Sequence, residues 1–261
     1  MGSAEVQGDL WGRAPDDWAG IQEVQHAPLW EAMLDSVGVG SGSRVLDAGC
    51  GGGGASVLAA GRGAAVSGWD ASEPLIGVAR RRVPQADFRV GDLEALPFAD
   101  GSFDSVIAAS SIQYADDRVA ALKELARVAT GEGEIAVGLW ATPDKVDYKV
   151  VFGAVRDALP EPPPGDGPFG LSAPGTLEAL IEQAGMNVMG AGEADCPFVY
   201  PDSETFWKAN ISAGPLQAAK GKVTEDDLRR SVLEAVEPYR TDDGGLRFEN
   251  VFRYVTAQPK A

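Results

Sequence analysis

The sequence predicts an α/β protein built on a doubly wound, mostly parallel sheet of seven strands. Short apolar runs alternate with helical patterns from residue 44 to residue 140, as in successive β-α-β units. Eleven of the 33 glycines fall between residues 38 and 68, and five of them follow the first apolar run directly, at 49–54. The chain of 261 residues is 44% hydrophobic, which suffices for one large core.

The N-terminal 37 residues have a helical pattern. Asp16 and Asp17 predict the start of a helix that runs towards Asp35, because acidic side chains stabilise the first turn. Pro28 is expected to break or restart this helix.

Five strands and three helices are predicted next. The strands are expected at 44–48, 64–69, 87–90, 103–110 and 134–140, and the helices at 55–60, 72–83 and 117–128. Ser72 is a suitable N-cap with Pro74 in the first turn. The nearly continuous apolar run 103–110 indicates a strand that is buried on both faces.

The regular alternation of predicted strands and helices ends after Trp140. Helices are predicted at 147–159, 176–183, 203–211 and 224–236, with a sixth strand at 187–191 and a final strand at 248–257. The segment 159–168 is rich in proline and glycine and is interpreted as a surface loop or a lid.

Composition excludes several classes of protein. With 22 basic and 39 acidic residues the net charge is −17, and the run 80–82 of three arginines is too short to bind a nucleic acid backbone. No apolar run reaches the about 18 residues of a membrane helix, and no signal peptide is recognised. Cys50 and Cys196 indicate no disulfide framework, so a cytoplasmic location is expected. With His26 as the single histidine, no metal site is expected.

The glycine-rich loop after the first strand indicates a ligand site. It satisfies Gly-x-Gly-x-x-Gly through Gly49, Gly51 and Gly54, and Asp70 follows Gly49 by 21 residues. That spacing also suits a dinucleotide site, so a nicotinamide oxidoreductase stays an alternative. However, Asp47 lies at the strand end, where a carboxylate would repel a pyrophosphate but attract an ammonium or sulfonium group.

Two further segments favour a nucleoside ligand with a positive charge. The segment 91–98 follows the third strand, and its Asp92 can accept a hydrogen bond from an adenine amino group while neighbouring apolar residues pack on the ring. The segment 99–107 then leads at a short distance into the fourth strand.

Together, the runs 45–53, 68–72, 91–98 and 100–111 resemble the class I S-adenosylmethionine-dependent methyltransferases. The group that includes the ubiquinone and menaquinone biosynthesis enzymes is the most similar in these motifs. The resemblance implies a Rossmann-like methyltransferase fold with an N-terminal helical lid at 1–37 and a cofactor-binding core at 38–141. An acceptor-binding insertion with the remaining core elements would follow at 142–240, and the final strand at 241–261.

The same resemblance implies roles for single residues. Asp47, Gly49 and Gly51 would line the methionine part of S-adenosylmethionine, Asp70 would bind the ribose hydroxyls, and Ala71 would lie against the adenine.

Three later positions would complete the cofactor site. Asp92 would bind the adenine amino group, Leu93 would pack on the ring, and Ser110 would lie near the reacting methyl. The expected product of the cofactor is S-adenosylhomocysteine.

Methyl transfer from a sulfonium needs a base only if the acceptor holds its proton, so no catalytic triad is required. His26 and Tyr114 are the candidate catalytic residues. Many relatives have a histidine in the segment matching 111–114, where this sequence has Gln113 and Tyr114 instead. The acceptor is expected to be small and apolar or aromatic, lying among candidate wall residues Trp140, Tyr148, Phe169, Phe198, Tyr200 and Trp207.

The function predicted is methyl transfer to such a metabolite, with carbon, oxygen and nitrogen acceptors all left open. An alternative keeps the fold and the cofactor but performs non-methylating chemistry such as a cyclisation, and a non-enzymatic binding module is a further one. The expected partner is a small-molecule substrate, without nucleic acid or membrane, and the protein is expected to be a monomer or homodimer.

Overall fold

A computed structural model describes residues 2–161, 165 and 167–260. A sheet of seven strands runs through it in the order β3-β2-β1-β4-β5-β9-β6. Only β9 is antiparallel to its neighbours, which confirms the mostly parallel, doubly wound fold. The strands are β1 (Arg44–Ala48), β2 (Ala65–Asp70), β3 (Asp87–Val90), β4 (Phe103–Ala109), β5 (Ala129–Trp140), β6 (Met186–Asp195) and β9 (Val251–Pro259).

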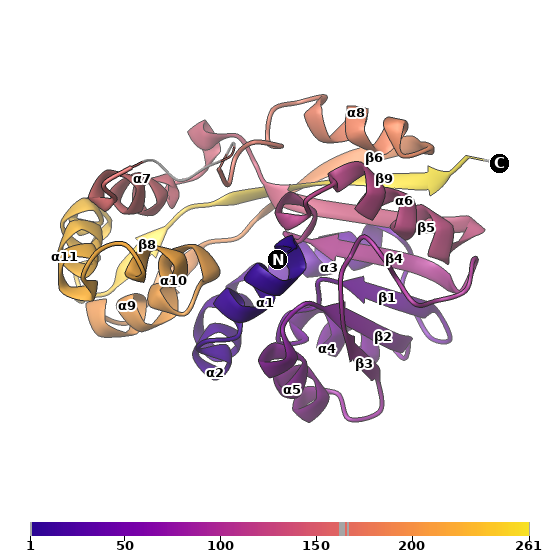
Figure 1. Cartoon of the computed structure of the whole chain (residues 1–261), viewed down its shortest axis with the longest axis horizontal. Coiled ribbons are helices and arrows are strands. Elements are labelled where there is room, and N and C mark those ends of the chain that lie inside the picture. Colours follow the sequence, from indigo (N-terminus) through magenta and orange to yellow (C-terminus); the bar gives the residue numbers. More distant parts are fainter. Residues whose placement is uncertain (1, 162–164, 166, 261) are drawn as a thin grey trace.

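Helices cover both faces of the sheet (Figure 1). One face packs against α3 (Ala27–Ser36), α4 (Gly54–Gly61) and α5 (Glu73–Arg82), and the other against α6 (Arg118–Val128) and α8 (Thr176–Gln183). Strand β1 is buried from its second residue onwards because its side chains face a helical layer on either side. The carboxyl ends of β1 and β2 therefore meet at one edge, as expected for the ligand site of this fold.

The N-terminal segment is helical but irregular. It contains α1 (Ser3–Trp11), the single turn α2 (Pro15–Asp17), a π-helix η1 (Trp18–Gln22) and a 3₁₀-helix η2 (Glu23–His26) before α3. The predicted restart at Pro28 is correct, since Pro28 lies in the first turn of α3. The continuous helix from Asp16 is wrong, because the π- and 3₁₀-turns interrupt it where side chains contact the glycine loop.

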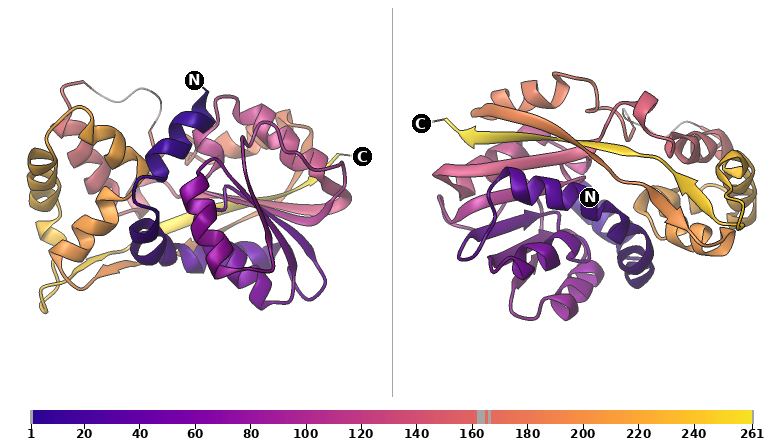
Figure 2. Two further views of the ribbon diagram at one scale, coloured as in Figure 1. Left: turned by 60° about the horizontal axis from the view of Figure 1, so that its bottom comes forward. Right: turned by 180° about the vertical axis from the view of Figure 1, so that it is seen from behind.

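The remaining elements gather at one end of the molecule, beyond β6 and β9 (Figures 1 and 2). They are α7 (Lys149–Ala158), α9 (Ser203–Ile211), α10 (Gly214–Lys220), α11 (Glu225–Ala235) and a small antiparallel sheet of β7 (Phe198–Tyr200) and β8 (Leu246–Phe248), with short 3₁₀-turns η3 (Ile112–Tyr114), η4 (Pro143–Lys145) and η5 (Glu237–Tyr239) elsewhere. Helix α1 packs on α10, so this end of the molecule also touches the N-terminal segment.

The predicted elements agree with the structure to within a few residues, with three corrections. The single final strand is two strands, β8 and β9, because Asn250 between them pairs with Val146 instead, and its side-chain Oδ1 accepts from the Tyr148 N–H. The sixth strand extends to Asp195, since β9 pairs with it throughout. Helix α10 and strand β7 were not predicted. Part of the lid interpreted at 159–168, residues 162–164 and 166, lies outside the described residues.

Across the described ranges, no helix combines the length and the apolar composition that crossing a membrane requires.

Candidate functional site

The glycine loop connects β1 to α4 through three left-handed backbone conformations. The φ angles of Gly49, Gly51 and Gly53 are 83°, 53° and 82°, values that side chains with a Cβ disfavour. The Gly49 N–H donates to the carbonyl of Trp69 at 2.7 Å, which attaches the loop to the end of β2. A Cβ at Gly49 would overlap the side chain of Ser111. The loop is thus bare backbone lying between the ends of β1, β2 and β4.

Two carboxylates flank this loop. Asp47 is 2% exposed, and its Oδ2 accepts from the Ser56 hydroxyl at 2.7 Å. Burial raises the pKa of Asp47 to about 6, with a further increase from the nearby charge of Asp70. Asp70 accepts from the Gly51 N–H at 2.9 Å and the Ser72 N–H at 2.8 Å, while burial raises its pKa as well. The loop is therefore a strongly negative site that suits a cationic ligand.

The segment after β3 is attached to the same edge of the sheet. The Trp69 indole N–H donates to the carbonyl of Asp92 at 2.9 Å, and Asp92 Oδ1 accepts from the Glu94 N–H at 2.9 Å. Leu93 is half-buried and packs against the core on the side of α6. Ala71 is half-buried beside α1, where a Cβ on Gly8 would overlap its carbonyl oxygen.

Ser110, directly after β4, is the one non-glycine residue with positive φ in the described part of the chain, at 55°. Its hydroxyl oxygen is buried and has no hydrogen-bond partner among the described residues. Ser111 donates instead to the carbonyl of Ala48 at 2.8 Å. A strained backbone with an unpartnered buried hydroxyl is typical of a functional position.

Tyr114 ends the turn η3, which contacts helix α1. Its ring packs edge-on against Trp11 at 5.7 Å, and its backbone carbonyl accepts from the Ser3 hydroxyl. Burial raises the pKa of Tyr114 to about 12. In this arrangement Tyr114 anchors α1 through Trp11, which in turn contacts Trp18 at 4.5 Å.

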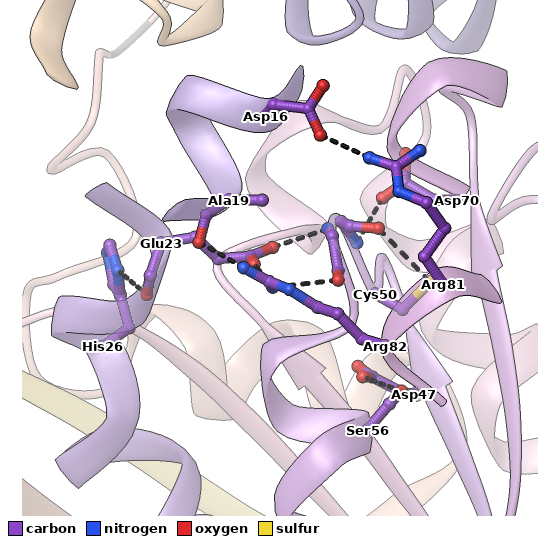
Figure 3. A network of polar contacts seen from close by, with 12 residues as sticks. Asp16, Ala19, Glu23, His26, Asp47, Cys50, Ser56, Asp70, Arg81 and Arg82 are labelled. Carbon is purple, nitrogen blue, oxygen red and sulfur yellow. Dashed lines mark hydrogen bonds and ion pairs between the residues drawn. The ribbon is translucent and has the colours of Figure 1, made fainter. Parts of the chain in front are cut away.

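Glu23 is a site residue that the sequence did not reveal. Its Oε1 accepts from the Gly52 N–H at 2.6 Å, and its Oε2 forms an ion pair with Arg82 at 2.7 Å (Figure 3). Arg82 also donates to the carbonyls of Gly52 at 3.0 Å and Ala19 at 2.5 Å. Glu23 is 4% exposed, and burial raises its pKa to about 7 despite the opposing charge of Arg82. The run of three arginines was the available signal, and its last member, Arg82, pairs with the buried Glu23 carboxylate.

His26 lies at the other end of the same 3₁₀-turn. Its Nδ1 donates to the carbonyl of Glu23 at 3.0 Å, which leaves Nε2 as the acceptor nitrogen. Burial lowers the pKa of His26 to about 4, so the ring is neutral at pH 7. The rings of Phe198 and Phe252 both lie 5.1 Å from it. No direct contact joins the rings of His26 and Tyr114 in the described part of the chain; Trp18, which contacts both His26 and Trp11, lies between them.

Most of the predicted wall residues belong to one buried aromatic cluster around His26. Trp140 stacks on Phe252 at 4.1 Å, and Tyr148 stacks on Trp140 at 6.0 Å. The Tyr148 hydroxyl donates to Asn210 Oδ1 at 2.5 Å. Four of the six predicted wall residues are connected by ring contacts to Trp140: Trp140 itself, Tyr148, Phe169 and Phe198. Tyr200 lies in β7, and Trp207 is buried on α9.

Two hydrogen bonds connect the N-terminal segment to this cluster. The Tyr200 hydroxyl donates to Gln22 Oε1 at 2.5 Å, and the Val199 N–H donates to Gln25 Oε1 at 2.6 Å. Consecutive residues of η1 and η2 therefore face the glycine loop through Glu23 and the aromatic cluster through Gln22 and His26. Within the described ranges, no three His, Cys, Asp or Glu side chains are placed to hold a metal ion.

Comparisons with known proteins agree with this geometry. A family described as a methyltransferase domain matches residues 46–137, from within β1 to within β5. A demethylmenaquinone methyltransferase of Beutenbergia cavernae is 36% identical over 126 residues, which are 48% of this chain and 52% of that protein. The chain spans about half the length of the curated relatives it matches.

Solved structures share the fold over most of the chain. A putative methyltransferase of Haloferax volcanii, in complex with the Trm112 methyltransferase activator, superposes with a TM-score of 0.63 at 20% identity over 97% of this chain and 98% of that one. The [4+2]-cyclase SpnF superposes with a TM-score of 0.58 at 18% identity, over 89% of this chain and 81% of that one. Residues 46–137 therefore match a methyltransferase domain family, and the fold of the chain is the one found in these solved structures.

Proposed function

We propose that the protein transfers a methyl group from S-adenosylmethionine to a small, apolar or aromatic metabolite. The observation that carries this proposal is the buried carboxylate of Asp47 and the half-buried carboxylate of Asp70 beside a bare glycine loop. Both carboxylates are more costly to ionise than in water, and a cation between them would offset that cost. The sulfonium and ammonium groups of this cofactor provide such charges.

The residues present fit the cofactor in chemistry. Asp47, Gly49 and Gly51 would hold its methionine part, and the unpartnered Ser110 hydroxyl supplies a hydrogen-bonding group on the same side. Asp70 would bind the ribose hydroxyls beside Ala71. Asp92 would accept from the adenine amino group while Leu93 packs on the ring.

When bound, the cofactor supplies an activated methyl group on sulfur. The protein then has to place the acceptor in line with the carbon–sulfur bond and exclude water, and this positioning supplies most of the rate. An acceptor that carries a proton would have to lose it on receiving that methyl group. His26 Nε2 is a neutral acceptor nitrogen at the aromatic cluster and would take that proton. Tyr114 would act by shaping the site through Trp11.

The acceptor side is assigned to the aromatic cluster and the N-terminal segment. The rings around His26 offer apolar contact, and the Tyr148 and Tyr200 hydroxyls add polar groups inside it. In this division, residues 1–37 act as the lid, 38–141 bind the cofactor, and 142–240 bind the acceptor. A cytoplasmic monomer or homodimer that acts on a small molecule is consistent with the charge and cysteine content.

The experiment is a calorimetric titration with S-adenosylmethionine, followed by incubation with methyl-labelled cofactor and a panel of small aromatic acceptors. Binding in the micromolar range and transfer of label to an acceptor support the proposal. Absence of binding at millimolar cofactor contradicts it.

One observation favours a second function, a cofactor-bound cyclisation without methyl transfer. His26 has a pKa of about 4 and is therefore a weak base, and the fold is shared with the [4+2]-cyclase SpnF. Product formed without transfer of label from the methyl group would support this alternative over the first.

A further inference from the structure

The contact between Glu23 and the glycine loop joins parts of the chain that are far apart in sequence. Gly52 is 29 residues from Glu23, and Arg82 is 59 residues from it. The Glu23 carboxylate receives one backbone N–H and one guanidinium group, and both interactions are charge-assisted. Glu23 thereby fixes η2 directly on the loop that is assigned to the cofactor.

The same contact fills the space next to the loop. A Cβ on Gly51 would lie 2.6 Å from Glu23 Oε1, and a Cβ on Gly52 would lie 2.7 Å from the Ala19 side chain. The Trp18 indole nitrogen would be 3.8 Å from the Cβ of Gly51. Residues 15–26, which we name the strap, therefore lie against the loop (Figure 3).

A second ion pair joins the strap to α5 without touching the loop. Asp16 pairs with Arg81, the residue next to Arg82, and both side chains of this pair are largely exposed. In contrast, the side chain of Glu23 is 5% exposed and that of Arg82 is 24% exposed. Buried charge pairs leave a costly unpaired charge when one partner is removed, whereas exposed pairs contribute little. Of the two ion pairs that join the strap to α5, the pair of Glu23 and Arg82 is thus the one that holds the strap on the loop.

We propose that Glu23 and Arg82 are positioning residues that form a latch between the strap and the glycine loop, and that breaking this latch limits how fast the cofactor enters and leaves. The proposal rests on the cofactor-binding part of the proposed function. The closed arrangement buries the Glu23 carboxylate at a desolvation cost, which the attraction of Arg82 partly offsets and the charge of Asp47 slightly increases. Segments that close over a bound ligand have to open again during turnover, and this opening often limits the rate.

The test measures cofactor exchange and loop opening in Glu23→Gln, Arg82→Gln and the double variant. Asp16→Asn is the matched control, because Asp16 is another carboxylate of the strap and pairs with Arg81, the arginine next to Arg82. Stopped-flow tryptophan fluorescence, with Trp18 as a reporter beside the loop, gives the association and dissociation rate constants for S-adenosylhomocysteine. Hydrogen exchange of residues 15–26 and 49–54 reports opening without any ligand.

Glu23→Gln is expected to raise both rate constants about tenfold, the change that corresponds to the loss of about 1.4 kcal/mol of closing free energy. Hydrogen exchange should rise in both segments, Asp16→Asn should change each quantity less than about twofold, and the double variant should be no faster than the single variants. A purely structural role would lower the melting temperature without changing the rate constants of the folded protein.

Three outcomes overturn the latch. Unchanged exchange rates in Glu23→Gln with normal cofactor binding contradict it alone, as does an equal acceleration in Asp16→Asn. If no variant and no wild-type protein binds the cofactor, the proposed function fails and the latch fails with it. Should Arg82→Gln not fold, Glu23→Gln and Glu23→Ala provide the same comparison, because the carboxylate is changed and the arginine is left in place.

Discussion

Replacing Asp47 with asparagine is expected to stabilise the protein without cofactor and to weaken cofactor binding. Asp47 is 2% exposed and has a pKa of about 6 instead of 3.8. A difference of about 2 pKa units corresponds to roughly 3 kcal/mol by which the folded state disfavours the ionised carboxyl. Asparagine keeps an oxygen that can accept from Ser56 but has no charge to desolvate.

The sign of the pH dependence follows from the direction of the shift. A folded-state pKa above the unfolded value means that the folded protein binds the proton more tightly, so this group favours folding at low pH. That contribution is lost as the pH rises from about 4 through about 6. The gain from Asp47→Asn should therefore reach about 1–3 kcal/mol at pH 8 and nearly vanish at pH 4.

Urea unfolding at pH 8 and pH 4 measures this gain, and calorimetry with S-adenosylmethionine measures the affinity. Loss of a charge-assisted contact with the cofactor predicts weaker binding by about tenfold to a hundredfold. Asp104→Asn is the control, since Asp104 is an exposed carboxylate whose pKa is lowered by Arg44, and its removal should cost a little stability. An Asp47→Asn protein that is less stable at pH 8 and binds the cofactor unchanged would refute the reasoning.

Three further predictions concern the loop and the aromatic cluster. His26 has a folded pKa of about 4, below its usual 6.5, so lowering the pH from 7.5 to 5.5 should cost the wild type roughly 1.3 kcal/mol of unfolding free energy that His26→Gln does not lose, as measured by urea titration. Gly49→Ala should destabilise by at least about 2 kcal/mol, because φ is 83° and the new Cβ overlaps Ser111, whereas Gly61→Ala, in open space at the end of α4, should be neutral or stabilising in the same assay. Trp140→Ala should lower the unfolding free energy by about 3–5 kcal/mol and weaken the near-ultraviolet circular dichroism, and a smaller loss would mean that the cluster is not tightly packed.

The parallel sheet was predictable because local pattern dictates it. Strands β1 and β4 read as short apolar runs, since helices cover both of their faces, and glycines follow β1 because its loop needs left-handed backbone at Gly49, Gly51 and Gly53. In the strand order β3-β2-β1-β4, the segments after β1, β2, β3 and β4 emerge at one edge. Asp47, Asp70 and Asp92 could therefore be grouped from sequence alone.

The tertiary structure alone decided what covers that edge. Glu23 has no motif around it, and its contacts with Gly52 and Arg82 depend on how the N-terminal segment packs across α5. From composition, the three consecutive arginines were interpreted only as a run too short to bind a nucleic acid backbone. In the structure, two of them pair with acidic residues of the strap. Strand β7 and helix α10 were missed for the same reason, because three residues of strand and seven of helix carry too little periodicity to stand out without their partners.

The sequence thus determined the sheet, the glycine loop and the carboxylates around it, since each depends on the order of residues within about 20 positions. It did not determine that the strap lies on the loop, that His26 is neutral inside an aromatic cluster, or that the Ser110 hydroxyl has no partner among the described residues. Those properties come from burial and charge contributed by segments up to 178 residues apart, as in the hydrogen bond from Tyr200 to Gln22, and burial of that kind exists only once the chain has folded.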